Sequence, residues 1–459
     1  MTGSEAIMGI AKKEVGSGAP LKIVQITPGT GHFFCGSCLR DEMLVRALRA
    51  RGHDVMMLPV YLPFVLESEA PPLVSGDAPV FLGGVNVFLQ HKVKLWKLLP
   101  RWMRSWLDQP GFLRWAAARG AMTEAKDLGE LTVAMLRGER GPQEEGLGQL
   151  LTWLREHERP DVLILSNAML SGLAGRLRAE LDRPILCTLQ GEAPFLDALV
   201  DPHRAAAWSE MAARARDVDH WIAVSRFTGA LMRERLALEE HRVSVVHNGI
   251  VIEGIASSTR PSPPQIGYLA RMCPDKGLHT LVDAFIALRH EHPALGARLH
   301  VAGVQLAEDR AYVKEQQRKL RDAGLEADVE WLPNCTREEK LRFLSSLSVL
   351  SVPAIYGESF GLYLVEAWAA GVPVVQPRHG AFPELIAHSG GGLLCEPGDA
   401  SSLAEQLARI LNDEALGRRL GAAGQKAARE YFSIERVACD IEAVCRRITA
   451  ERSAREPVR

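Results

Sequence analysis

Short apolar runs rich in β-branched residues alternate along most of the chain with longer segments rich in Ala, Leu and Arg that have a helical period. Near-continuous apolar runs bounded by turns are typical of strands buried on both faces of a parallel sheet. The pattern predicts a first group of strands at 21–27, 161–166, 184–189, 220–225 and 242–247. It predicts a second group at 265–270, 297–303, 329–334, 349–354 and 373–377. The expected fold class is therefore α/β, with two doubly wound, Rossmann-like lobes.

The alternation stops at SSTRPSPPQ, where prolines and polar residues suit neither a helix nor a strand. We place a linker there, at 257–264. Ligands of open α/β sheets bind at the carboxyl ends of the strands, so two such lobes facing each other would enclose a cleft. Before the linker we expect a flexible leader at 1–20 and an N-terminal lobe at 21–256, with a helical insertion around 61–160. After it we expect a C-terminal lobe at 265–430 and a last helix at 431–459. One option is that this last helix crosses back to the N-terminal lobe.

Charge and composition narrow the class of protein. The 459 residues carry 54 Lys and Arg against 56 Asp and Glu, a net charge of −2, so no global basic field favours nucleic acid. Hydrophobic residues make up 47% of the chain, as expected of a folded protein. No apolar run is long enough for a signal peptide or a membrane span, and the eight cysteines are scattered. We therefore expect a folded protein of the reducing cytoplasm.

The strongest group of candidate residues lies in PAIYGESFGLYLVEAWAAGVPVV (353–375), where a strand runs through a glycine-flanked turn into a helix expected to begin near Phe360. Glu358 lies in the turn and Glu366 inside the helix. A carboxylate at the position of Glu366 can accept hydrogen bonds from two ribose hydroxyls. Unpaired N–H groups at a helix start favour phosphate or sugar oxygens. Those N–H groups belong to Phe360, Gly361 and Leu362. The alternative is that both acids are solvated helix residues.

A second group lies in GYLARMCPDKGLHTLVDAF (267–285), where a strand is followed by a turn that carries Arg271 and Lys276. Two cations that leave the end of one strand can neutralise a diphosphate, a task that other enzymes give to a metal ion. The alternative is that both side chains are solvated, as is usual for a loop Arg and Lys.

These motifs together resemble glycosyltransferase family 4, the retaining enzymes of the GT-B fold, over about 265–430. The family's E-x7-E pattern falls on Glu358 and Glu366, and its Arg and Lys fall on Arg271 and Lys276. The resemblance implies transfer of a sugar from a nucleoside diphosphate sugar to a hydroxyl, with retention of configuration and with neither a metal ion nor a cofactor. The cations would hold the leaving diphosphate, while Glu358 and the helix-start amides would bind the donor.

The resemblance implies further donor-site residues. HGAFPELI is similar to the family's glycine-acid turn, which places Glu384 near the donor pocket. In the N-terminal, acceptor-side lobe, TPGTGHFFCGSCLRD is similar to a glycine-rich loop whose amides approach the diphosphate, and Gly29, Thr30 and Gly31 match that role. Gln190 takes a position where the family often has a His that bonds the donor sugar.

Two further departures lie in the C-terminal lobe. AGVQLAEDR (302–310) stands where the family has a glycine-rich turn, and WLPNC (331–335) replaces its usual glycine-containing strand end. Because of these departures, the nucleobase of the donor cannot be assigned from the sequence. The sugar of the donor cannot be assigned either. An epimerase acting on nucleotide sugars and a non-catalytic carbohydrate-binding partner stay as alternative functions, because a fold does not fix a reaction.

The acceptor cannot be assigned beyond a carbohydrate or a lipid-linked molecule, because 61–160 matches no recognised motif. Within it, 91–120 is basic with Trp and Leu at helical spacing, which is typical of an interfacial helix on anionic lipid. That reading would place the protein at the inner membrane face; the alternative is an insertion packed on the first lobe. Cys35 and Cys38 form a C-x-x-C pair, for which we favour a structural role over a metal or redox role, and His32 could line the acceptor side.

Overall fold

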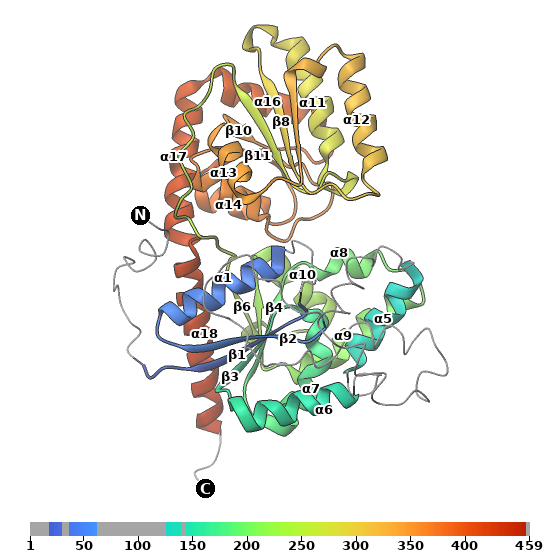
Figure 1. Cartoon of the computed structure of the whole chain (residues 1–459), viewed down its shortest axis with the longest axis vertical. Helices are drawn as coiled ribbons and strands as arrows, with labels where there is room; N and C mark the ends of the chain where they lie inside the picture. The colour runs from blue at the N-terminus through green and yellow to red at the C-terminus, as the bar shows by residue number, and fades with distance from the viewer. Residues whose placement is uncertain (1–17, 30–35, 62–124, 139–143, 456–459) are drawn as a thin grey trace. The chain divides into compact units, whose positions relative to one another are not determined.

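The computed structural model describes residues 18–29, 36–61, 125–138 and 144–455 (Figure 1). Within these residues the strands form two six-stranded sheets. The first has the order β2-β1-β3-β4-β5-β6, and the register is parallel from strand to strand. Its strands are β1 (Lys22–Thr27), β2 (Asp54–Pro59), β3 (Val162–Leu165), β4 (Ile185–Leu189), β5 (His220–Ala223) and β6 (Val243–Val245).

Strand β2 was absent from the strands expected from the sequence. Its sequence DVMMLP contains one β-branched residue, so its composition does not favour a strand. The pairing is instead set by β1, with which it runs in parallel from Lys22 opposite Asp54 to Thr27 opposite Pro59. Long-range pairing has overridden local preference here.

Within the described residues, helices follow β1 to β5, whereas β6 is followed by β7 with no helix between them. Helix α10 has a side-chain cap: the Oγ atom of Ser225 accepts a hydrogen bond of 3.0 Å from the N–H of Thr228. The helices of this part are α1 (Gly36–Ala50), α5 (Ala125–Arg137), α6 (Glu144–Trp153), α7 (Ala174–Leu181), α8 (Glu192–Asp197), α9 (His203–Arg214) and α10 (Arg226–Leu236).

The second sheet has the order β12-β11-β10-β7-β8-β9 and is also parallel. In this doubly wound order, β8 and β9 are added on one side of β7, and β10 to β12 are added on the other side. The strand order therefore reverses between β7 and β10. Ligands of doubly wound sheets bind at such a reversal. The strands are β7 (Gln265–Leu269), β8 (Arg298–Gly303), β9 (Val329–Pro333), β10 (Val349–Leu350), β11 (Val374–Pro377) and β12 (Gly392–Cys395).

Strand β10 is much shorter than the strand expected at 349–354. After Leu350 the N–H of Ser351 still donates to the carbonyl of Gly267 at 2.9 Å, but Pro353 has no N–H to give. The N–H of Ala354 turns back to the carbonyl of Val352 at 2.8 Å. The chain therefore leaves the sheet just before the candidate residues that follow.

The second sheet is enclosed by helices. Its core contains the fully buried side chains of Tyr268, Phe285, Trp368 and Phe382. Among the neighbouring pairs of helices, α11 packs against α16 and α14 against α17. The helices are α11 (Leu278–Glu291), α12 (Arg310–Asp322), α13 (Arg337–Ser345), α14 (Leu362–Ala369), α15 (Phe382–Ser389), α16 (Ala400–Asn412), α17 (Glu414–Tyr431) and α18 (Ile434–Arg455). In the described ranges no helix has the length and apolarity to cross a membrane.

Contacts divide the chain into two compact units. The first contains the residues up to Thr188, together with Leu199–His220 and the residues from Ile441 on; the second contains Leu189–Ala198 and Trp221–Asp440. The long helix α18 therefore contributes its first turns to the second unit and the rest to the first. The boundary that we expected at 257–264 stays a prediction.

A buried carboxylate fixes the later part of α18 within the first unit. The Oε2 atom of Glu442 lies 2.7 Å from the guanidinium of Arg51 and 3.3 Å from Nε2 of His53. Its Oε1 atom accepts a hydrogen bond of 2.8 Å from Arg446. Burial raises the pKa of Glu442, but Arg446, Arg51 and His53 outweigh it and hold the pKa at about 2. The carboxylate is therefore charged and fully paired.

Candidate functional site

The candidate residues follow two adjacent strands of the second sheet. Arg271 and Lys276 follow β7, and the segment 353–361 follows β10, which pairs with β7. Because parallel strands present their carboxyl ends at one edge, the two groups meet where the strand order reverses. The structure therefore brings together the two groups of residues that the sequence analysis selected separately.

The two turns are held in direct contact by their backbones. The N–H of Ile355 donates to the carbonyl of Asp275 at 3.0 Å. Gly277 follows a 3₁₀ turn at Pro274–Lys276 and has a φ of +69°; a Cβ atom added there would lie 1.8 Å from the carbonyl oxygen of Pro353. Only glycine permits both this conformation and this approach. The glycine therefore sets the position of Lys276 against the neighbouring turn.

Lys276 and Glu358 form an ion pair, and two tyrosines share the same carboxylate. The ammonium of Lys276 bonds both the Glu358 carboxylate and the hydroxyl of Tyr356. The hydroxyls of Tyr356 and Tyr363 donate to Oε2 of Glu358 at 3.2 and 3.1 Å. Glu358 is only 7% exposed, which is not the environment of a solvated surface acid.

The environment keeps the lysine charged and the phenols protonated. Burial lowers the pKa of Lys276, but Glu358 and Tyr356 more than offset it and the pKa is raised. Burial and the Glu358 carboxylate raise the pKa of Tyr356 to about 12 and that of Tyr363 well above its usual value. Neither tyrosine was selected from the sequence, although both lie within five positions of Glu358. Their aromatic rings gave no signal of a polar role.

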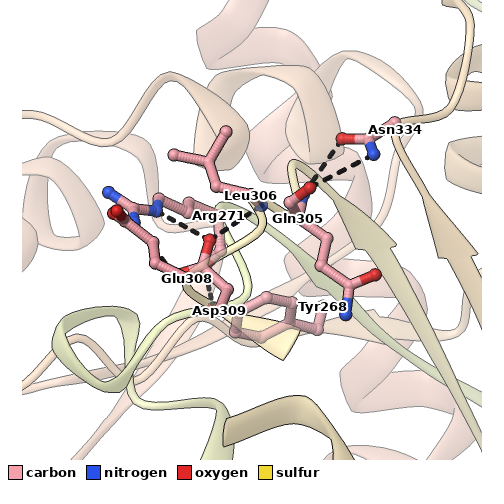
Figure 2. Close-up of polar contacts among 7 residues, drawn as sticks. All are labelled: Tyr268, Arg271, Gln305, Leu306, Glu308, Asp309 and Asn334. Atoms are coloured by element: carbon pink, nitrogen blue, oxygen red, sulfur yellow. Dashed lines mark hydrogen bonds and ion pairs between the residues drawn. The ribbon is translucent and has the colours of Figure 1, made fainter. Parts of the chain in front are cut away.

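Arg271 is held by two acids on the loop after β8 (Figure 2). Its Nε and Nη2 atoms donate to the two carboxylate oxygens of Asp309, each at 2.9 Å, and Nη2 also bonds the Glu308 carboxylate. The hydroxyl of Tyr268 donates to the backbone carbonyl of Arg271 at 2.8 Å. The hydrogen bonds that Arg271 donates to Asp309 raise its pKa against the effect of burial, with a further contribution from Glu308. The guanidinium is therefore permanently charged and fixed in orientation.

The loop that carries these acids is the one in which the sequence departs from the family pattern. The N–H of Leu306 donates to Oδ2 of Asp309 at 2.9 Å. Gln305 and Asn334 bond each other, the N–H of Gln305 to Oδ1 of Asn334 at 3.0 Å (Figure 2). Neither Glu308 nor Asp309 was expected at the site from the sequence. The signal that could have found them is an acid pair in the loop after β8, the neighbour of β7.

Helix α14 begins at Leu362, two residues after the expected start near Phe360. Gly361 precedes it with a φ of +83°. In the described part of the chain, the N–H groups of Phe360, Gly361 and Leu362 have no backbone acceptor. Phe360 is 2% exposed, so its ring packs in the core beneath the helix start. Three donors are thus left at the positive end of α14.

Glu366 lies in the second turn of α14 and is paired. Its Oε1 atom accepts a hydrogen bond of 2.7 Å from Nζ of Lys340 on α13. The side chains are 19% and 28% exposed. Lys340 was not selected from the sequence, because nothing local relates it to a residue 26 positions away.

Gln190 and Glu384 both contact other residues of the second unit. The carbonyl of Gln190 accepts a hydrogen bond of 3.0 Å from Ser359, next to the start of α14. The Oε1 atom of Glu384 accepts one of 2.8 Å from the N–H of Arg226. Burial raises the pKa of Glu384, against the effect of that N–H. Gln190 is therefore held through its backbone carbonyl by the hydroxyl of Ser359, and Glu384 is held through its carboxylate by a backbone N–H.

For several residues predicted from the sequence, the structure describes few contacts or none. Gly29 follows β1 with a φ of +87°. Thr30, Gly31, His32, Cys35 and the segment 91–120 lie outside the described residues; Cys38 lies in α1, and its side chain is not described. Within the ranges that are described, no three His, Cys, Asp or Glu side chains gather as a metal ion would require.

Comparison with a solved structure identifies the class of fold. The chain is similar to HepE from Anabaena in complex with UDP, with a TM-score of 0.65 and 17% identity, over 93% of this chain and 100% of that one. Together with the two doubly wound parallel sheets, this places the chain in the GT-B fold of glycosyltransferases.

Two stretches of the chain match families of known proteins. Residues 132–253 match Glycosyltransferase Family 4, and residues 255–427 match Glycosyl transferases group 1. Together the two matches support a glycosyltransferase of the family 4 type.

The curated relatives of the chain include a glycosyltransferase and a phosphotransferase. The chain is 26% identical to D-inositol 3-phosphate glycosyltransferase from Pseudarthrobacter chlorophenolicus over 380 residues, which are 76% of this chain and 86% of that protein. It is 31% identical to exopolysaccharide phosphotransferase SCO2592 from Streptomyces coelicolor over 219 residues. That match covers 48% of this chain but only 22% of the relative's length.

Proposed function

We propose that the protein transfers a sugar from a nucleoside diphosphate sugar to a hydroxyl acceptor, with retention of configuration and without a metal ion. The observation that carries the proposal is that Arg271 and Lys276, after β7, lie at the same sheet edge as the three N–H donors at the start of α14, after β10. Cations and free amides at one sheet edge suit a diphosphate. HepE, similar in fold, is a UDP complex, which supports a nucleotide donor.

The residues have separate roles in this proposal. Arg271 and Lys276 stabilise the negative charge that develops on the leaving diphosphate, which replaces the task of a metal ion. Glu358 orients Lys276 and binds donor hydroxyls, and Glu366 holds the ribose. Gln190 and Glu384 border the donor, as the family resemblance implies.

No side chain is assigned as a nucleophile. The family's retaining chemistry suits a front-face transfer, in which the leaving phosphate receives the proton of the acceptor hydroxyl. The bond from the anomeric carbon to the phosphate oxygen breaks while the bond to the acceptor oxygen forms on the same face. Catalysis then consists of positioning and electrostatic stabilisation.

A thermal-shift screen of UDP-, GDP- and ADP-sugars identifies the donor, since a ligand that binds the folded state raises its stability. Turnover of that donor is then compared in Lys276→Ala, Glu366→Ala and the native protein, with and without EDTA. Both variants should lose at least about tenfold in kcat/KM, equal to about 1.4 kcal/mol, and EDTA should have no effect.

The matched control is Lys319→Ala, because Lys319 pairs with Asp283 on the outer helices and both side chains are more than a third exposed. Its turnover should equal that of the native protein. Unchanged turnover in both site variants would remove the proposed donor site. Isomerisation of a labelled donor without acceptor would favour the epimerase alternative, whereas slow hydrolysis favours a transferase.

A further inference from the structure

The acids that hold Arg271 differ in burial. Asp309 has a side chain that is 4% exposed, whereas the Glu308 side chain is 71% exposed. Asp309 is also bonded by the N–H of Leu306, so its carboxylate is fixed by three donors. No hydrogen bond other than that to Arg271 is seen for Glu308 among the residues that the structure describes. The Asp309 carboxylate is therefore fixed within the loop, whereas the Glu308 side chain can move away from Arg271.

The guanidinium has more donors than Asp309 uses. Asp309 takes Nε and one N–H of Nη2, and Glu308 takes the other N–H of Nη2. Nη1 of Arg271 has no partner in the described ranges. A guanidinium binds phosphate best through two parallel N–H groups, and the pair formed by Nη1 and Nη2 is complete only when Glu308 is absent.

We propose that Asp309 is a positioning residue for Arg271 and that Glu308 is an internal anion which the diphosphate of the donor must displace. The proposal rests on the proposed function, because it needs a diphosphate at Arg271. Glu308 thereby lowers the affinity for diphosphate groups, and Asp309 raises it by holding the guanidinium in place. The loop after β8 thus sets the strength of donor binding from outside the two family motifs.

The test measures the dissociation constant of inorganic pyrophosphate for the full chain by calorimetry. Glu308→Gln should bind up to about fivefold more tightly, the factor expected from removing an exposed ion pair. Glu326→Gln is the matched control, because Glu326 forms an exposed pair with Arg321 near the other end of α12. It should bind as the native protein does. Equal affinities of Glu308→Gln and native protein would overturn the displacement.

The role of Asp309 needs a readout that a loss of folding would not imitate. Asp309→Asn keeps an oxygen for the N–H of Leu306 but loses the charge, so it should weaken pyrophosphate binding about tenfold. In an Arg271→Ala background the same substitution should have no further effect, because its action passes through the guanidinium. An equal loss in both backgrounds would show a purely structural role and overturn the positioning.

These outcomes are distinct from failure of the proposed function. If pyrophosphate binds the native protein, Arg271→Ala and Lys276→Ala with the same affinity, the diphosphate site itself is wrong. If those two variants weaken binding while Glu308→Gln leaves it unchanged, the donor site stands and only the displaced anion is wrong.

Discussion

Lys276 and Glu358 lie 82 positions apart in the chain and form a partly buried ion pair at the adjoining ends of β7 and β10. The pair joins the two groups of residues that were expected at the site from the sequence, one after β7 and one after β10. Because Tyr356 and Tyr363 donate to the same carboxylate, its charge is satisfied from three sides. A stable arrangement of this kind defines the site before any ligand binds.

The first prediction concerns the energy of this pair. Lys276→Met or Glu358→Gln alone should lower the free energy of unfolding by about 3 kcal/mol, since each leaves one group buried without its partner. The double variant should lose less than the sum of the two. Denaturant unfolding measures all three. In the exposed pair of Lys319 and Asp283, the same cycle should give less than about 1 kcal/mol. Simple additivity at Lys276 and Glu358 would show that they do not depend on each other.

The second prediction separates backbone strain from collision. Gly277 and Gly324 have φ values of +69° and +71°, but a Cβ atom at Gly324 would meet no atom within 4 Å. Gly324→Ala should therefore cost only the conformational term, about 1 kcal/mol. Gly277→Ala should cost several times more and lower donor turnover, because it pushes Lys276 away from Pro353. The midpoints of thermal unfolding and the turnover rates check this, and equal costs at the two glycines would contradict it.

The third prediction concerns acid stability. His247 packs against the rings of Phe360, Phe432 and His388. Burial lowers its pKa to about 4, with smaller contributions from His388 and Arg226 in the same direction and from Asp440 in the opposite one. As the pH falls from 6.5 towards 4, the unfolded chain takes up a proton at this position before the folded chain does, so stability falls over that window.

Between pH 7 and 4.5 this residue should account for a loss of about 2 to 3 kcal/mol in the free energy of unfolding. His247→Phe should remove that part of the loss, because the ring keeps its packing and cannot be protonated. His241→Gln is the control, since His241 is exposed beside Glu239. If His247→Phe and native protein lose stability in parallel over this range, the assignment fails.

The fourth prediction concerns the carboxylate in α18. Glu442→Gln should destabilise the first unit by about 3 kcal/mol, because Arg51 loses its buried counter-charge. Glu451 is another glutamate of the same helix, and it forms an exposed ion pair with Arg447. Glu451→Gln should therefore change the free energy of unfolding by less than about 0.5 kcal/mol. Chemical unfolding followed by circular dichroism measures both. Similar effects of the two substitutions would be inconsistent with a burial-dependent role.

The sequence could predict the fold because strands buried on both faces leave continuous apolar runs, as at 161–166 and 265–270. It failed for β2, whose position depends on pairing with β1 rather than on its own residues. The GT-B fold and the family were confirmed by the structure and the comparisons. The lobe boundaries and the roles of the individual site residues stay predictions.

At the site, local motifs indicated which residues would be near the strand ends but not which would pair. Arg271 and Asp309 are 38 positions apart, and their contact depends on the path of the loop after β8. The contact of Glu366 with Lys340 likewise depends on how α13 packs beside α14. Ion pairs between separate elements are set by tertiary structure, and periodicity within one element contains no information about them.

The membership of α18 in both units affects any attempt to recombine this enzyme with a relative. Exchanging residues 257–459 as one continuous block would replace Glu442 and Arg446 along with the second sheet. The recipient's His53 and Arg51 would then face a foreign helix. A workable hybrid has to take residues 441–455 from the parent that supplies the N-terminal half, with the crossover placed inside α18 near Asp440.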